Sequence, residues 1–252
     1  MDLSNLPAPV FTAVDGTTQG LAAVCYLVIG AAAWLHARAD IRTRLFLAFS
    51  IANATVFGLP TIWWLRGISD PTRLPHVVLV TEMAALGLGA LLLFHFTQVF
   101  PRRRPWIKGA GAQMAIGYVL VPSAIAGLVA FLPATPQAVT APYLLAGIVF
   151  GFPLLVLLGL VLPIGAIMSL FRSHQDVQKQ GLDRLKVPLE VILLSQVAGG
   201  TLAILFAPVL AVLAPNSVMR VVLTVVVWAL GLLTPLAYAA AVWKFDVLTV
   251  DP

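Results

Sequence analysis

The residues best placed to do chemistry in this sequence are a few ionisable side chains within long apolar stretches: Glu82, His95 and Glu190. Glu82 follows His76 by six residues, which at helical rise puts it about 9 Å into its stretch. A charge in such surroundings needs a partner, water or a proton. Two interpretations of Glu82 stay open: a ligand- or proton-responsive site, or a structural group bonded to a neighbouring helix.

His95 and Glu190 are expected at similar depth, near the ends of their apolar stretches. One hypothesis is a direct contact between them. The other pairs Glu190 with Lys186, one helical turn earlier, and bonds His95 to a backbone carbonyl, because intramembrane polar groups often join helices. Both residues, with Glu82, are candidate ligand- or proton-responsive groups.

Motifs for known catalysis are missing from the sequence. It contains no HExxH, GxSxG or P-loop pattern. The only cysteine, Cys25, cannot form an internal disulfide and belongs to no Cys/His cluster. His36 and His95 by themselves are weak evidence for a haem, and no lysine lies in the interior of an apolar stretch, where it could hold retinal. We therefore expect no catalytic residue, no metal site, no cofactor and no enzymatic activity in this chain.

Composition predicts where these groups reside. Hydrophobic residues make up 60% of the chain and charged residues 10%, with a mean hydropathy of +0.99. Soluble domains have about 25% charged residues, so lipid must be the solvent for much of this surface. A membrane-spanning helix needs about 20 apolar residues. Seven stretches meet that length, at 17–37, 45–65, 76–100, 108–132, 141–171, 187–214 and 217–243. They predict an all-α, polytopic bundle of seven transmembrane helices.

Basic residues predict the orientation of this bundle. Twelve of the 15 lysines and arginines fall between spans 1 and 2, 3 and 4, or 5 and 6, or in the tail. Under the positive-inside rule these segments are cytoplasmic and the N-terminus is outside. We thus expect a cytoplasmic linker at 172–186 and a cytoplasmic tail at 244–252. The positive charge serves topology and anionic lipid headgroups, not nucleic acid; the densest group is Arg102, Arg103, Arg104 and Lys108.

The fifth stretch has two features of its own. Gly147, Gly151 and Gly159 lie along one helical face, which predicts close helix packing, with a homodimer as one possibility. Pro153 and Pro163 predict a kink or tilt.

Three segments carry a resemblance to a known family: HFTQVFPRRRPW (95–106), QGLDRLKVPLEVILL (180–194) and TPLAYAAAVWKFDVL (234–248). Together they resemble the seven-helix N-terminal membrane region of bacterial sensor histidine kinases and related signalling proteins. His95, Phe100 and Pro101 match the family's ending of span 3. Phe245 and Asp246 match the junction between the last span and an output domain, although the spacing is shortened near Lys244.

The resemblance implies a multi-pass sensor in the bacterial inner membrane whose last helix signals to a cytoplasmic output domain. The chain ends at Pro252, so we expect either a longer parent chain or a stand-alone relative that signals through a partner. A non-catalytic accessory subunit of a membrane complex, with neighbouring membrane subunits as partners, is the alternative. A transporter or lipid-modifying enzyme would need a continuous polar cavity, for which the sequence supplies few groups.

Overall fold

The computed structural model describes residues 8–65, 75–101, 105–131, 141–212 and 218–243, and these ranges contain helices and short turns but no strand. The all-α class is therefore confirmed. The long helices have the following bounds: α1 (Ala8–His36), α2 (Ile41–Leu65), α3 (His76–Val99), α4 (Gly111–Phe131), α8 (Asp183–Val212) and α9 (Val218–Trp243). A short 3-10 helix, η2 (Pro105–Lys108), precedes α4.

Six helical segments of the described chain are long and apolar enough to cross a membrane, which indicates a multi-pass membrane protein. They are Gly16–His36, Ile41–Trp63, His76–Val99, Gly111–Phe131, Gly147–Lys179 and Val222–Trp243. The seventh predicted span, 187–214, corresponds to α8 as far as Val212, and its last two residues lie outside the described chain. This helix is not among the six, and its first turns carry Asp183, Arg184, Lys186 and Glu190.

The fifth predicted span is one helical run that contains two π-helical turns. Its parts are α5 (Ala141–Ala146), the π-helical turn η4 (Gly147–Gly151), α6 (Phe152–Val156), the π-helical turn η5 (Leu157–Val161) and α7 (Leu162–Lys179). Pro153 and Pro163 each follow a π turn by two residues. Proline cannot donate the usual helical hydrogen bond, and a π turn rearranges the bonding around it. The run therefore accommodates both prolines without ending.

The expected linker at 172–186 is mostly helical. Helix α7 continues to Lys179 and α8 begins at Asp183, so only a tight turn separates them. Gly181 in this turn has a φ of +65°, a conformation that glycine adopts without strain. The polar stretch stays helical because it buries a stripe of residues at helical spacing on both sides of the turn: Leu170, Ser173, Val177, Leu185 and Leu189.

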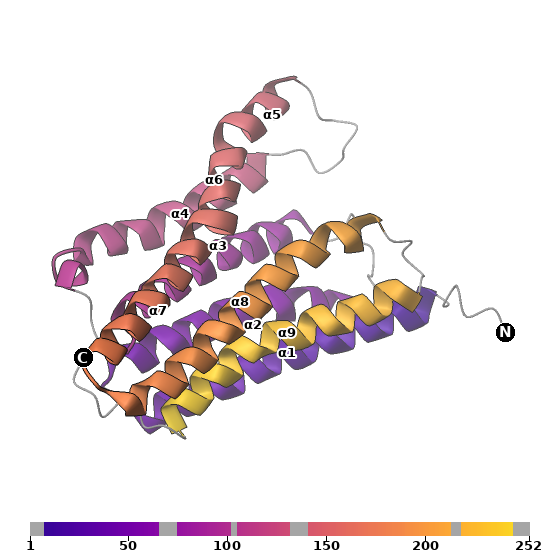
Figure 1. Cartoon of the computed structure of the whole chain (residues 1–252). Helices are drawn as coiled ribbons and strands as arrows, with labels where there is room; N and C mark the ends of the chain where they lie inside the picture. The colour runs from indigo at the N-terminus through magenta and orange to yellow at the C-terminus, as the bar shows by residue number, and fades with distance from the viewer. Residues whose placement is uncertain (1–7, 66–74, 102–104, 132–140, 213–217, 244–252) are drawn as a thin grey trace.

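Six helices form a closed ring in the order α1, α2, α3, α7, α8, α9. Neighbours along this order pack together, and the contacts of α1 with α9 and α3 with α7 close it. Helix α4 packs outside the ring against α3, beside η4, and Ile125 is its only buried residue. In Figure 1, α4 and the α5–α6 run lie together on one side of the ring.

The connections alternate between the two ends of the ring. One end of the ring, on the left of Figure 1, holds the turns 37–40 and 180–182, the end of α3 with η2, and the end of α9. We call this the basic end. It gathers residues from three connections and from the end of α9, which are far apart in the sequence.

Candidate functional site

A buried arginine ties two connections together at the basic end. Arg42 is the second residue of α2 and is only 1% exposed. Its Nη2 lies 2.6 Å from Asp40 Oδ2, and its Nε donates to both carboxylate oxygens at 3.0 Å. Its Nη1 donates to the carbonyl oxygen of Pro101 at 2.7 Å. A buried guanidinium is tolerated only when such partners replace water, so Arg42 holds the end of α3 against the start of α2.

Asp40 is placed for this contact by its position before α2. Its Oδ1 accepts the backbone N–H of Arg42 at 2.7 Å, as an N-cap residue does. Thr43 donates its hydroxyl to the carbonyl of Ala37 at 2.6 Å, which closes the turn 37–40 against the helix. The local sequence thus fixes both the carboxylate and the arginine that it binds.

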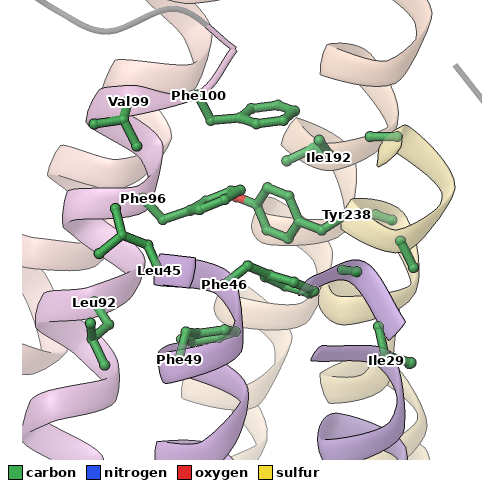
Figure 2. Close-up of a cluster of buried hydrophobic side chains, with 14 of the residues drawn as sticks. Ile29, Leu45, Phe46, Phe49, Leu92, Phe96, Val99, Phe100, Ile192 and Tyr238 are labelled. Carbon is green, nitrogen blue, oxygen red and sulfur yellow. The ribbon is translucent and has the colours of Figure 1, made fainter. Parts of the chain in front are cut away.

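Four aromatic rings lie next to Arg42, and Figure 2 shows how these rings pack together. Tyr238 of α9 meets Phe96 edge-on at a centroid distance of 4.7 Å and Phe100 at 5.7 Å. Phe46 of α2 lies 5.5 Å from the Tyr238 ring. We call Phe46, Phe96, Phe100 and Tyr238 the aromatic cluster. Such pairs add about 0.5–1.5 kcal/mol each beyond their burial.

The cluster is packed rather than hollow. The cavity between Arg42 and these rings has a volume of about 10 Å³, close to the minimum for a single water. The hydroxyl of Tyr238 lies near the carboxamide of Gln196, but the Tyr238 hydroxyl and Gln196 Nε2 are both buried without a hydrogen-bond partner. The arrangement has no room for a ligand. It can pass a displacement of α3 or α2 to α9, because close-packed side chains transmit strain.

Glu82 lies in the half of α3 remote from the basic end and is half-buried. Within the described chain, the structure gives its carboxylate neither a hydrogen bond nor an ion pair. The interhelical bond offered as one interpretation of Glu82 is therefore not seen among these residues.

His95 and Glu190 do not contact each other through any described bond. His95 Nδ1 makes a short hydrogen bond with the hydroxyl of Tyr118, which joins α3 to α4. Glu190 accepts from His174 of α7 at 3.1 Å, at the surface of the basic end. The described bonds thus give the two residues different partners, Tyr118 for His95 and His174 for Glu190.

The three glycines of the fifth span differ in their surroundings. A Cβ on Gly151 would lie 3.2 Å from a methyl of Leu128 in α4, whereas one on Gly147 or Gly159 would meet nothing within 4 Å. Of this face, Gly151 alone packs closely against another helix of the described chain.

Some residues of the family signature are buried in the core, and others lie outside the residues that the structure describes. Phe100 and Pro101 are buried at the centre of the basic end. Phe245, Asp246 and the arginines 102–104 lie outside the described residues, as does the side chain of Lys108. Of the signature, His95 packs towards α4 instead of the aromatic cluster.

Sequence reasoning missed the central residues of this site. The sequence pattern uses Arg42 only as one of the basic residues that predict orientation. Tyr238 lies in the resembling segment 234–248, but no pattern there predicts its contacts. A usable signal for Arg42 was Asp40 two residues earlier at a helix start, where a capping carboxylate and an arginine come within reach. The described residues bring no three His, Cys, Asp or Glu side chains together as a metal site.

Comparison with protein-family models and with curated proteins finds no match to this chain.

Proposed function

We propose that this chain is a sensor or receptor-type membrane module that passes a conformational signal through α9 to a cytoplasmic output domain or partner. In this proposal seven helices cross the bacterial inner membrane, α8 included, with the N-terminus outside. The family resemblance supports it, since the three resembling segments include the ends of α3 and α9. The module itself has no catalytic role.

The observation that carries the proposal is the direct packing of Tyr238 on Phe96 and Phe100. It joins the span that holds Glu82 to the helix that continues into the tail. Arg42 also binds the chain at the end of α3, because it donates to the carbonyl of Pro101, the residue after Phe100. A tilt or rotation of α3 therefore changes the surface on which α9 packs.

Orientation is tested by cysteine labelling in a Cys25→Ala background. Ser4→Cys and Gln180→Cys introduce single thiols at the N-terminus and in the exposed turn between α7 and α8. We expect a membrane-impermeant maleimide to label Ser4→Cys in intact cells and Gln180→Cys only after permeabilisation. Labelling of Gln180→Cys in intact cells would contradict the topology and the proposed route of signalling.

Signal transfer is tested by measuring the distance between spin labels at Leu35 and Trp243, two exposed positions at the basic end. We expect Glu82→Gln to shift the distance distribution in lipid nanodiscs. Thr81→Val, a change of similar size at the next residue, is the matched control and is expected to leave it unchanged. An identical distribution for wild type and Glu82→Gln would remove Glu82 as the input.

Substitutions at Tyr238 test whether the aromatic cluster carries the change in the Leu35–Trp243 distance. Tyr238→Phe keeps the ring contacts, so the effect of Glu82→Gln on the distance is expected to persist. Tyr238→Leu removes them and is expected to abolish the effect. Transfer that survives Tyr238→Leu would show that α9 is reached by another route.

One observation favours the alternative of an accessory subunit. Helix α4 lies outside the ring with a single buried residue, and an apolar groove of about 650 Å³ is lined by α4 on one side and by residues 146–157 on the other. A neighbouring membrane subunit could fill this groove with a helix. Copurification with an enzyme or transport complex at fixed stoichiometry, lost on Gly127→Phe, would support this function over the sensor.

A further inference from the structure

A second hollow of the described chain lies on the side of the ring where α3 meets α7, at the basic end. Its volume is about 370 Å³, within the range of about 300–1,000 Å³ typical of small-molecule sites. It is lined by Phe94, Gln98, Trp106, Gly165, Met168, Ser169 and Arg172. We call it the α3–α7 cleft.

The sequence builds the α7 wall from one helical stripe. Gly165, Met168, Ser169 and Arg172 follow the spacing i, i+3, i+4, i+7 and so share a face. The stripe runs from apolar to cationic toward the basic end. Its middle is fixed to α3, because Ser169 donates its hydroxyl to the carbonyl of Thr97 at 3.0 Å.

The α3 wall is shaped by a close approach of the two helices. A Cβ on Gly165 would lie 2.9 Å from the ring of Phe94, so the ring can occupy this position because residue 165 has no side chain. The ring of Trp106 from η2 lies 6.4 Å from the Phe94 ring and is half-exposed. These residues form the apolar part of the cleft wall. Met168, which also lines the cleft, is exposed at the surface.

Gln98 supplies the observation that points to a ligand. Gln98 is only 5% exposed, and it lines the cleft. The structure gives its carboxamide no hydrogen bond within the described chain. Because Gln98 lines the cleft, its carboxamide is available to hydrogen-bond a molecule bound there.

We propose that the α3–α7 cleft binds an anionic phospholipid of the leaflet at the basic end. The Arg172 guanidinium presents a planar fork that matches phosphate oxygens. The Gln98 amide lines the same cleft and can donate to the same headgroup. The indole of Trp106 favours the headgroup region, and Phe94 and Met168 offer an apolar bed for the first part of an acyl chain.

Charge distinguishes this cleft from the groove beside α4. That groove is lined by apolar residues alone and offers nothing to a headgroup. The α3–α7 cleft combines a cation, a buried amide and an apolar wall, which is the combination a phospholipid needs at the interface between headgroups and acyl chains. The inference depends on the membrane location of α3 and α7 and not on signalling, so it can fail while the sensor proposal stands.

Native mass spectrometry of the full chain, purified and exposed to equal amounts of phosphatidylglycerol and phosphatidylcholine, tests the site. We expect the wild type to retain phosphatidylglycerol preferentially. Arg172→Ala is expected to lower the ratio of the two retained lipids about fivefold, from the usual gain per basic residue at an anionic surface. Gln98→Leu removes the amide donor and is expected to lower it about threefold.

Arg184→Ala is the matched control, because it removes an exposed arginine at the same end but outside the cleft. It is expected to change the ratio less than about twofold. Circular dichroism of each variant checks that the helices persist, and Arg172→Lys, which keeps the charge, is expected to restore part of the preference.

Three results would overturn the inference. Equal retention of the two lipids by the wild type would remove the headgroup preference. An effect of Arg184→Ala equal to that of Arg172→Ala would show general surface attraction. Displacement of phosphatidylglycerol by excess inorganic phosphate would show a site for a soluble anion; we expect no displacement, because phosphate lacks the acyl chain that occupies the apolar wall.

Discussion

Arg42→Met isolates the tie between the start of α2 and the end of α3. Methionine keeps a long flexible side chain and removes the charge and the donors. It leaves the Asp40 carboxylate without its ion-pair partner and the Pro101 carbonyl without the 2.7 Å bond from Nη1. The change therefore acts on stability through lost bonds more than through lost volume.

The cost follows from the burial of the groups left behind. Removing one partner of a buried ion pair costs about 3–5 kcal/mol. The Asp40 side chain keeps 15% of its surface exposed, so water recovers part of its solvation. We therefore expect a loss near the lower end, about 3 kcal/mol. For a chain of this size, 1 kcal/mol corresponds to roughly 2–4 °C in Tm, which gives a fall of roughly 6–12 °C.

Thermal unfolding followed by tryptophan fluorescence in lipid nanodiscs measures this change. Arg44→Met is the matched control, since Arg44 is exposed and, within the described residues, its Nε donates to a local carbonyl, that of Arg38, at 2.9 Å. We expect the control to shift Tm by no more than about 1–2 °C, as exposed substitutions do. Arg42→Lys, which keeps the charge but not the fork, should fall between them.

Hydrogen exchange locates the effect. Loss of the Pro101 contact should lower the protection of backbone amides at 96–100 in Arg42→Met and leave that of α4 unchanged. Equal stability of Arg42→Met and Arg44→Met would refute the reasoning, because it would mean that the buried arginine contributes no more than a surface one.

Three further substitutions test the packing by the same thermal assay. Gly30→Ala is expected to destabilise by about 1–3 kcal/mol, because the new Cβ would lie 2.4 Å from Ser50 Cβ; Gly117→Ala, with open space around it, should not. Tyr238→Phe should be neutral or slightly stabilising, since its buried hydroxyl has no hydrogen-bond partner, while Tyr238→Ala should cost about 3–5 kcal/mol. Ser169→Ala removes the bond between α7 and α3 and should cost about 1 kcal/mol. A stable Gly30→Ala, a strongly destabilised Tyr238→Phe or a neutral Ser169→Ala would each contradict the corresponding contact.

The helices were predictable from the sequence because the length of an apolar run is a local property. The stretch at 76–100 became α3, with bounds His76–Val99. The helical linker was harder to predict. Residues 172–186 look polar overall, and their helicity depends on a stripe buried against other helices, of which Val177 and Leu185 are members.

The site was less predictable, because contact between helices depends on rotation about their axes as well as on depth. His95 and Glu190 are expected from the sequence at a similar depth, but their described bonds go to Tyr118 and His174. A count of basic residues likewise treats all arginines alike, whereas Arg42 is 1% exposed and Arg44 lies at the surface. Phe100 was singled out by resemblance alone, and its partner Tyr238 belongs to a segment 138 residues later, a pairing that no local pattern specifies.

The placement of these residues limits how a signal from Glu82 would travel under the proposed function. Glu82 and Phe96 are 14 residues apart on α3, about 21 Å along a helix, so the two side chains cannot act by direct contact. The helix must move as a body. The bond from Arg42 to the Pro101 carbonyl opposes sliding of α3 along α2, which leaves tilt or rotation about this fixed end. Either motion turns the face that holds Phe96, and Tyr238 packs edge-on against that ring. The arginine tie thus acts as a pivot, and removing it should weaken transfer to α9 even in molecules that remain folded.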